Sequence, residues 1–149
     1  GNYASNGGAI ASSAKINELK GNFISNTATN VGGAFHNISN GTVNFIDSSF
    51  IGNYAGNEGG AIYSSGTNSV VTVTAENKDV YFINNTSGSA NNTGIYIKQG
   101  TLNLNANGHK IEIDDNMYLN GTTNVALDNG TLKLGQDSAK NYTFTKMEV

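Results

Sequence analysis

Apolar and polar residues alternate in short stretches along this chain. The segments 101–105 (TLNLN), 110–114 (KIEID) and 131–134 (TLKL) each place an apolar side chain at every second position. A period of two over such lengths predicts strands that bury one of their two faces. Pairs of Asn and Gly, which favour tight turns, separate these stretches at 40–41, 107–108, 120–121 and 129–130. The pattern predicts an all-β chain of short strands joined by close turns.

A longer pattern recurs in the first 85 residues. Residues 50–62 (FIGNYAGNEGGAI) echo residues 23–35 (FISNTATNVGGAF), and residues 1–10 (GNYASNGGAI) repeat the second half of both. The shared core is FxxN, a short gap, and then GGA followed by an apolar residue. A repeat at a spacing of 25–27 residues predicts stacked units, each too small to bury an apolar face alone.

The repeat extends into three apolar columns, clear in residues 1–85 and drifted in residues 86–149. The first column is Ile10, Phe35, Ile62, Ile97 and Leu127; the second is Ile16, Val43, Val71, Leu102 and Leu132; the third is Phe23, Phe50, Phe82, Ile111 and Phe144. Antiparallel hairpins with a period of three strands would not bring equivalent residues together. A coil of three strands does so on every turn. We therefore predict one domain, residues 1–149, forming a right-handed single-stranded parallel β-helix of four to five coils, roughly 4.8 Å apart.

Stacking at this spacing explains the residues of the two motifs. The phenylalanines of FxxN, at 23, 50 and 82, are expected to stack on one another. The paired glycines allow a sharp bend or a close backbone approach, and the alanines fit where space is small. The residues expected to carry the structure are Gly7, Gly8, Ala9, Phe23, Asn26, Gly32, Gly33, Ala34, Phe50, Asn53, Gly59, Gly60, Ala61, Phe82 and Asn85.

The asparagine of FxxN is expected to lie at a corner, where Asn tolerates left-handed geometry. A buried amide there can donate to one coil and accept from the next. Asn26, Asn53 and Asn85 would form such a ladder, and Asp114 would continue it in a drifted copy.

These repeats resemble the polymorphic membrane proteins of intracellular Gram-negative bacteria and related autotransporter passengers. The signature of that family is multiple copies of FxxN and GGA followed by Ile, Leu or Val; here Phe35 departs from it. The resemblance covers about residues 1–85. It implies a β-helical passenger that is secreted and displayed at the bacterial cell surface through a C-terminal outer-membrane barrel outside this sequence. It also implies a role in adhesion to host cells, and so in virulence.

Composition narrows the function classes. Charged residues form only 13% of the chain, the net charge is −3, and the few lysines are scattered, so there is no basic footprint for nucleic acid. The absence of cysteine excludes a disulfide framework and cysteine metal sites. No apolar run reaches the roughly 18 residues of a membrane span.

The residues offer little for catalysis, and we expect no enzyme activity, cofactor or metal. Polysaccharide lyases built on β-helices use an arginine base, and this chain has no arginine. Asp114 and Asp115 are the only neighbouring carboxylates, and we interpret them as a solvated turn. His36 and His109 fall in different repeats. The alternative hypothesis is a carbohydrate-active β-helix of the polysaccharide lyase or glycoside hydrolase kind.

Exposed side chains give the remaining hypotheses. The tyrosines could stack on sugar rings or cover strand faces, and the second interpretation is favoured; they are Tyr54, Tyr63, Tyr81, Tyr96 and Tyr118. The TxT pattern of ice-binding proteins occurs once, at Thr72-Val73-Thr74, and is discounted because the sequence shows no repeat of it. The longest insertion, Thr86–Thr93, is a candidate recognition loop.

Together these observations favour a structural stalk or adhesive segment of a secreted surface protein. Its expected partners are a host-cell surface or glycan ligand and flanking coils of the same β-helix. Because a coil at either end of the stack has an unpaired edge, we also expect end-to-end self-association.

Overall fold

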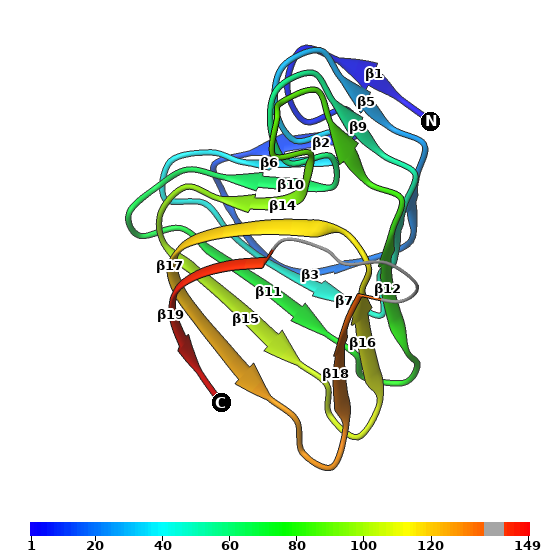
Figure 1. Ribbon diagram of the computed structural model, residues 1–149, viewed down its shortest axis with the longest axis vertical. Coiled ribbons are helices and arrows are strands. Elements are labelled where there is room, and N and C mark those ends of the chain that lie inside the picture. Colours follow the sequence, from blue (N-terminus) through cyan, green and yellow to red (C-terminus); the bar gives the residue numbers. More distant parts are fainter. Residues whose placement is uncertain (136–141) are drawn as a thin grey trace.

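The chain forms a single-stranded parallel β-helix, as predicted. A computed structural model describes residues 1–135 and 142–149, the last segment through 147 by its backbone alone, and every strand pair in this part is parallel. Figure 1 shows the strands of successive coils lying side by side from the N-terminal end to the C-terminal end.

Three sheets run along the helix axis. The short corner sheet contains β1 (Tyr3–Ala4), β5 (Thr27–Ala28), β9 (Tyr54–Ala55) and β13 (Thr86–Ser87). The sheet with the FxxN phenylalanines contains β4 (Phe23–Ile24), β8 (Phe50–Ile51), β12 (Val80–Ile83), β16 (Lys110–Ile113) and β18 (Thr131–Leu134).

The third and largest sheet has two halves. Its first half contains β2 (Ile10–Ser12), β6 (Phe35–Asn37), β10 (Ile62–Ser64) and β14 (Thr93–Ile97). Its second half contains β3 (Lys15–Lys20), β7 (Thr42–Ile46), β11 (Val70–Thr74) and β15 (Thr101–Asn105). The long strand β17 (Asn116–Ala126) pairs with both β14 and β15 and so joins the halves, and β19 (Tyr142–Glu148) pairs with β17.

Successive coils can be numbered by these strands. Coil one is β1–β4, coil two β5–β8, coil three β9–β12, coil four β13–β16, and coil five β17–β18. The first four coils each have four strands, one more than the expected three. The additional short strand follows the FxxN motif and pairs with its counterpart in the neighbouring coil, forming the corner sheet. Coil five lacks this corner: Asp115 is followed at once by β17.

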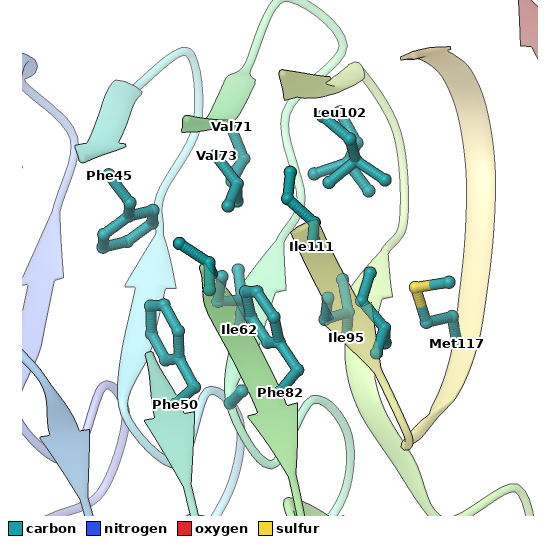
Figure 2. Packing of buried hydrophobic residues seen from close by; sticks show 14 of the residues in the cluster. Phe45, Phe50, Ile62, Val71, Val73, Phe82, Ile95, Leu102, Ile111 and Met117 are labelled. Carbon is teal, nitrogen blue, oxygen red and sulfur yellow. The ribbon is translucent and has the colours of Figure 1, made fainter. Parts of the chain in front are cut away.

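The predicted phenylalanine stack forms the centre of the core. Phe23 and Phe50 have ring centroids 4.8 Å apart, and Phe50 and Phe82 4.7 Å apart, with the rings nearly parallel. Phe45, on β7, packs edge-on against Phe23, Phe35 and Phe50. Figure 2 shows Phe45, Phe50 and Phe82 pointing into one interior together with aliphatic side chains of later coils. The alternation of Val43 and Phe45 was the signal for this buried ring.

The columns are correct for coils one to three and, in coil four, for Leu102, but the other later members are wrong. In the first column, Ile95 and Met117 replace Ile97 and Leu127; in the second, Thr123 replaces Leu132; in the third, Ile113 and Leu134 replace Ile111 and Phe144. The backbone of Phe144 pairs with Leu119 instead.

Unequal coil lengths explain these errors. Equivalent residues lie 27 positions apart between Asn26 and Asn53, 32 apart between Asn53 and Asn85, and only 21 apart between Asn103 and Asn124. Extra residues between β11 and β12 lengthen coil three: paired residues lie 28 positions apart at Phe45 and Val73 but 32 apart at Phe50 and Phe82. The missing corner shortens coil five, so a fixed period cannot follow the chain there.

The two glycines of GGA have different physical tasks. The first, at 7, 32 and 59, has a φ of 57–68°, a conformation that residues with a Cβ rarely adopt. The second allows close stacking: a Cβ on Gly33 would lie 2.0 Å from the carbonyl oxygen of Gly60 in the next coil. The alanine that follows is fully buried in coils two and three. Both expected roles of the pair, bend and close approach, are therefore confirmed.

The structure contains a fourth copy of this corner, which the repeat pattern in the sequence does not reveal. Gly60 and Ala61 donate hydrogen bonds to the carbonyls of Thr93 and Gly94, and Ile62 pairs with Ile95. The segment 92–95 (NTGI) thus occupies the place of GGAI, and Asn92, with a φ of 47°, takes the left-handed position of the first glycine. Asn is the residue other than Gly that most readily substitutes there.

Candidate functional site

The asparagine ladder is internal and structural. The Nδ2 group of Asn26 donates to Oδ1 of Asn53 at 2.9 Å, and Nδ2 of Asn53 donates to Oδ1 of Asn85 at 2.8 Å. The backbone N–H of each donor residue binds the same oxygen. Asn2 begins the series by donating to Asn26 in the same way. All three predicted asparagines are buried, so the FxxN residues serve coil stacking and are closed to ligands.

The left-handed geometry belongs to the residue before each of these asparagines. Ser25, Gly52 and Asn84 have φ values of 55°, 66° and 58°, whereas the ladder asparagines are not in this region. The left-handed geometry was predicted for the asparagine itself and lies one residue before it. The turn at the third position of FxxN points the following side chain back into the stack.

Asp115, and not Asp114, continues the ladder. Its Oδ1 accepts the backbone N–H of Asn85 at 3.0 Å, and its Oδ2 accepts Nδ2 of Asn85 at 2.7 Å. Asp115 is only 4% exposed, so the interpretation of the pair as a solvated turn was wrong for this residue. Oδ1 of Asp114 is buried and has no hydrogen-bond partner among the described residues.

The two histidines lie in different settings. His36 packs edge-on against Tyr63, with ring centroids 5.3 Å apart, and burial lowers the pKa of its imidazole. Nδ1 of His109 lies 4.0 Å from a carboxylate oxygen of Asp79. In the described part of the chain, no group of three or more His, Cys, Asp or Glu side chains could hold a metal ion.

A tyrosine ladder lies on the outside of the first half of the large sheet. Tyr63, Tyr96 and Tyr118 occupy one register position, and their rings stack with centroids 5.4 and 4.6 Å apart. Stacked rings cover each other's faces and leave their edges to the solvent. Since sugars stack on the faces of aromatic rings, this arrangement favours the interpretation that the tyrosines cover the strands.

In coils two to five, the outside of the second half of the large sheet is an array of uncharged side chains, which we call the polar face; Lys15 on β3 adjoins it in coil one. Its residues share outward register positions on β7, β11, β15 and β17: Thr42, Asn44, Val70, Thr72, Thr74, Thr101, Asn103, Asn105, Thr122 and Asn124. All are partly exposed. In Figure 1 these four strands run side by side.

Hydrogen bonds between neighbouring coils hold the side chains of the polar face in place. Nδ2 of Asn103 donates to Thr72, and Nδ2 of Asn124 donates to Oδ1 of Asn103 at 2.9 Å. The hydroxyl of Thr74 donates to Oδ1 of Asn44 at 3.1 Å. The pattern at Thr72-Val73-Thr74 does not recur in register, because Ile46, Asn105 and Ala126 take the place of Thr74 in the other strands. The row of Thr72 continues instead as Asn44, Asn103 and Asn124.

An open hollow marks one end of the polar face. It has a volume of about 170 Å³, and its outward-facing lining includes Lys15, Asn17, Thr42, Asn44, Val70 and Thr72. The amides and hydroxyls around it can both donate and accept hydrogen bonds, and Val70 gives it an apolar spot.

Charged side chains gather on a different sheet. Glu112, on β16, is 4% exposed and lies 3.2 Å from Nζ of Lys110 and 3.6 Å from Nζ of Lys133. Lys110 also lies over the ring of Tyr81, 5.2 Å from its centroid. This cluster covers the outside of the sheet and neutralises its own buried carboxylate.

The predicted recognition loop is partly absorbed into the fold. Thr86 and Ser87 form β13, and Thr93 begins β14. The hydroxyl of Thr93 donates to Glu58 at 2.8 Å and accepts the N–H of Gly59. Only the middle of the segment remains as a turn, closed by a hydrogen bond from Asn92 to Ser89.

The described residues form no helix that could span a lipid bilayer. Comparison with protein-family models, with curated proteins and with solved structures gave no match in any of the three.

Proposed function

We propose that this chain is a β-helical segment of a secreted bacterial surface protein, acting as a stalk and as an adhesive surface toward host cells or matrix. The resemblance of its FxxN and GGA repeats to polymorphic membrane proteins supports this proposal. In it, the segment belongs to the cell surface, with flanking coils of the same kind as its structural partners.

One observation carries the proposal most directly. The motif residues are used for stacking: the phenylalanines form the core, the asparagines form the internal ladder, and the glycines let the coils approach. What remains on the outside is a regular surface with little charge. Such a molecule is suited to spanning distance and presenting a broad face.

The alternative of a carbohydrate-active enzyme loses its best candidate. Asp115 is committed to Asn85 and is buried, so it is not available to act together with Asp114. Inverting glycosidases need two acids flanking the substrate. The enzyme hypothesis would be supported if the chain released reducing ends from a polysaccharide and the Asp114→Asn variant did not.

Binding to host cells tests the proposal. The purified chain, fluorescently labelled, is added to cultured epithelial cells and to immobilised matrix proteins, with a heat-unfolded sample as the control. Saturable binding by the folded chain is the expected result. If the chain does not bind while a longer protein that contains it does, the role of this segment is only that of a spacer.

A further inference from the structure

We propose that the polar face binds a linear, uncharged polysaccharide laid along the helix axis. This inference rests on the adhesive role proposed above and names its ligand class and its surface.

The chemistry of the polar face selects a neutral ligand. Across coils two to five its outward positions on β7, β11, β15 and β17 carry Thr, Asn and Val70 and no charged side chain. The net charge of −3 disfavours a polyanion such as a sulfated glycan. Amides and hydroxyls match the hydroxyl groups of sugars, because each can donate and accept.

The spacing selects a repeating ligand. Ring centroids stacked between neighbouring coils lie 4.6–5.4 Å apart, which is comparable to the length of one sugar unit in a linear polysaccharide. A chain running across the strands would meet the same pair of register positions at every unit. The central row supplies Asn44, Thr72, Asn103 and Asn124, one from each coil.

The side chains are already arranged for binding. The bonds from Asn103 to Thr72 and from Asn124 to Asn103 fix these groups before a ligand arrives, which reduces the entropy lost on association. The hollow at the end of the polar face, about 170 Å³ and with Val70 in its lining, can seat a terminal sugar. Val70 would face the apolar C–H side of that ring.

Calorimetric titration with neutral oligosaccharides tests the proposal. The probes are β-1,4- and β-1,3-linked glucose, mannose and N-acetylglucosamine oligomers of two to six units. We expect affinity for at least one series to rise with length up to about four units, one per coil, and to be unchanged between low and high salt.

Two variants and a matched control locate the site. Thr72→Val and Asn103→Leu keep the shape of the strands but remove hydrogen-bonding groups, and each should weaken binding about tenfold. Tyr96→Phe removes a hydroxyl from the tyrosine ladder and should leave binding unchanged. Circular dichroism and melting curves confirm that all three variants fold.

Three results would overturn the inference. These are no binding to any neutral series, binding only to charged glycans with loss at high salt, or equal weakening by Tyr96→Phe. If cells are still bound equally by Thr72→Val and Asn103→Leu, the adhesive role stands and the polar face is not its site. If the wild-type chain binds oligosaccharides but no cells, the adhesive role fails alone.

Discussion

Truncating one asparagine of the internal ladder is the sharpest test of how the coils are held together. Asn53 is fully buried. Its Oδ1 accepts two hydrogen bonds from Asn26, and its Nδ2 donates to Asn85 and to the carbonyl of Phe23, all at 2.8–2.9 Å. In Asn53→Ala all four bonds disappear, and their partners stay buried.

The expected cost follows from these four bonds. At about 1 kcal/mol net for each, Asn53→Ala should lower the free energy of unfolding by about 4 kcal/mol. A domain of ordinary stability, about 5–15 kcal/mol, would lose a large part of its margin. Urea unfolding followed by circular dichroism measures this change.

An exposed asparagine provides the matched control. Asn30 joins a second ladder on the outside, donating to Asn6 and accepting from Asn57. Because water replaces these bonds, Asn30→Ala should cost no more than about 0.5 kcal/mol. Equal losses in Asn53→Ala and Asn30→Ala would refute the claim that burial gives the ladder its strength.

A charge at the same position gives an independent readout. Asn53→Asp keeps an acceptor for Asn26 but sets a carboxylate oxygen against the carbonyl oxygens of Asn85 and Phe23. Burial and these acceptors raise the pKa of the introduced carboxyl in the folded state above its unfolded value. Its penalty is therefore present at neutral pH and declines as the pH falls through the folded pKa. Unfolding curves from pH 7 to pH 4 should show relative recovery of this variant against wild type, and a constant difference would contradict the assignment.

Other parts of the fold give three further predictions. Gly33→Ala should cost about 1–3 kcal/mol by overpacking, since its Cβ would meet the next coil. Gly52→Asn should be tolerated, because a Cβ there would make only an ordinary contact of 3.7 Å with the hydroxyl of Ser25 and Asn accepts the positive φ of this position. Thermal melting separates the two variants, and equal melting temperatures would contradict the close approach. Burial lowers the pKa of His36 from 6.5, so the folded state loses stability as the pH falls below about 6.5. His36→Tyr should reduce this loss, measured as the difference in the free energy of unfolding between pH 7 and pH 5 in urea titrations. A hollow of about 380 Å³ lined by Ile10 and Phe23 opens at the N-terminal end of the stack, and we expect the chain to self-associate there; sedimentation showing only monomer at millimolar concentration would argue against it.

The sequence determined the architecture wherever the motifs were intact. Phe23, Phe50 and Asn53 repeat at a spacing that only a stack of coils can use, because a parallel β-helix places equivalent side chains over one another. The chemistry of each residue type also limited its place: two glycines in a row allow the left-handed turn and the close approach that a Cβ would block.

The tertiary structure decided the register of the later coils. Asp115 replaced Asp114, and Ile113 replaced Ile111, because coil four keeps the loop length of coil three: Leu102 and Ile113 lie 11 positions apart, as do Val71 and Phe82. A strand with alternating residues looks the same when shifted by two positions, so the sequence alone could not fix this choice. Pairing with the neighbouring coil fixed it.

Both outer surfaces were likewise decided by the tertiary structure. Tyr63, Tyr96 and Tyr118 became one ladder, and Thr72 joined Asn103 on the polar face, only through pairing between strands far apart in the chain. Sequence sets which side chains point inward, since burial of apolar groups has a strong local signature. Which outward side chains become neighbours depends on coil length, and coil length is set by the loops that each turn of the helix accommodates.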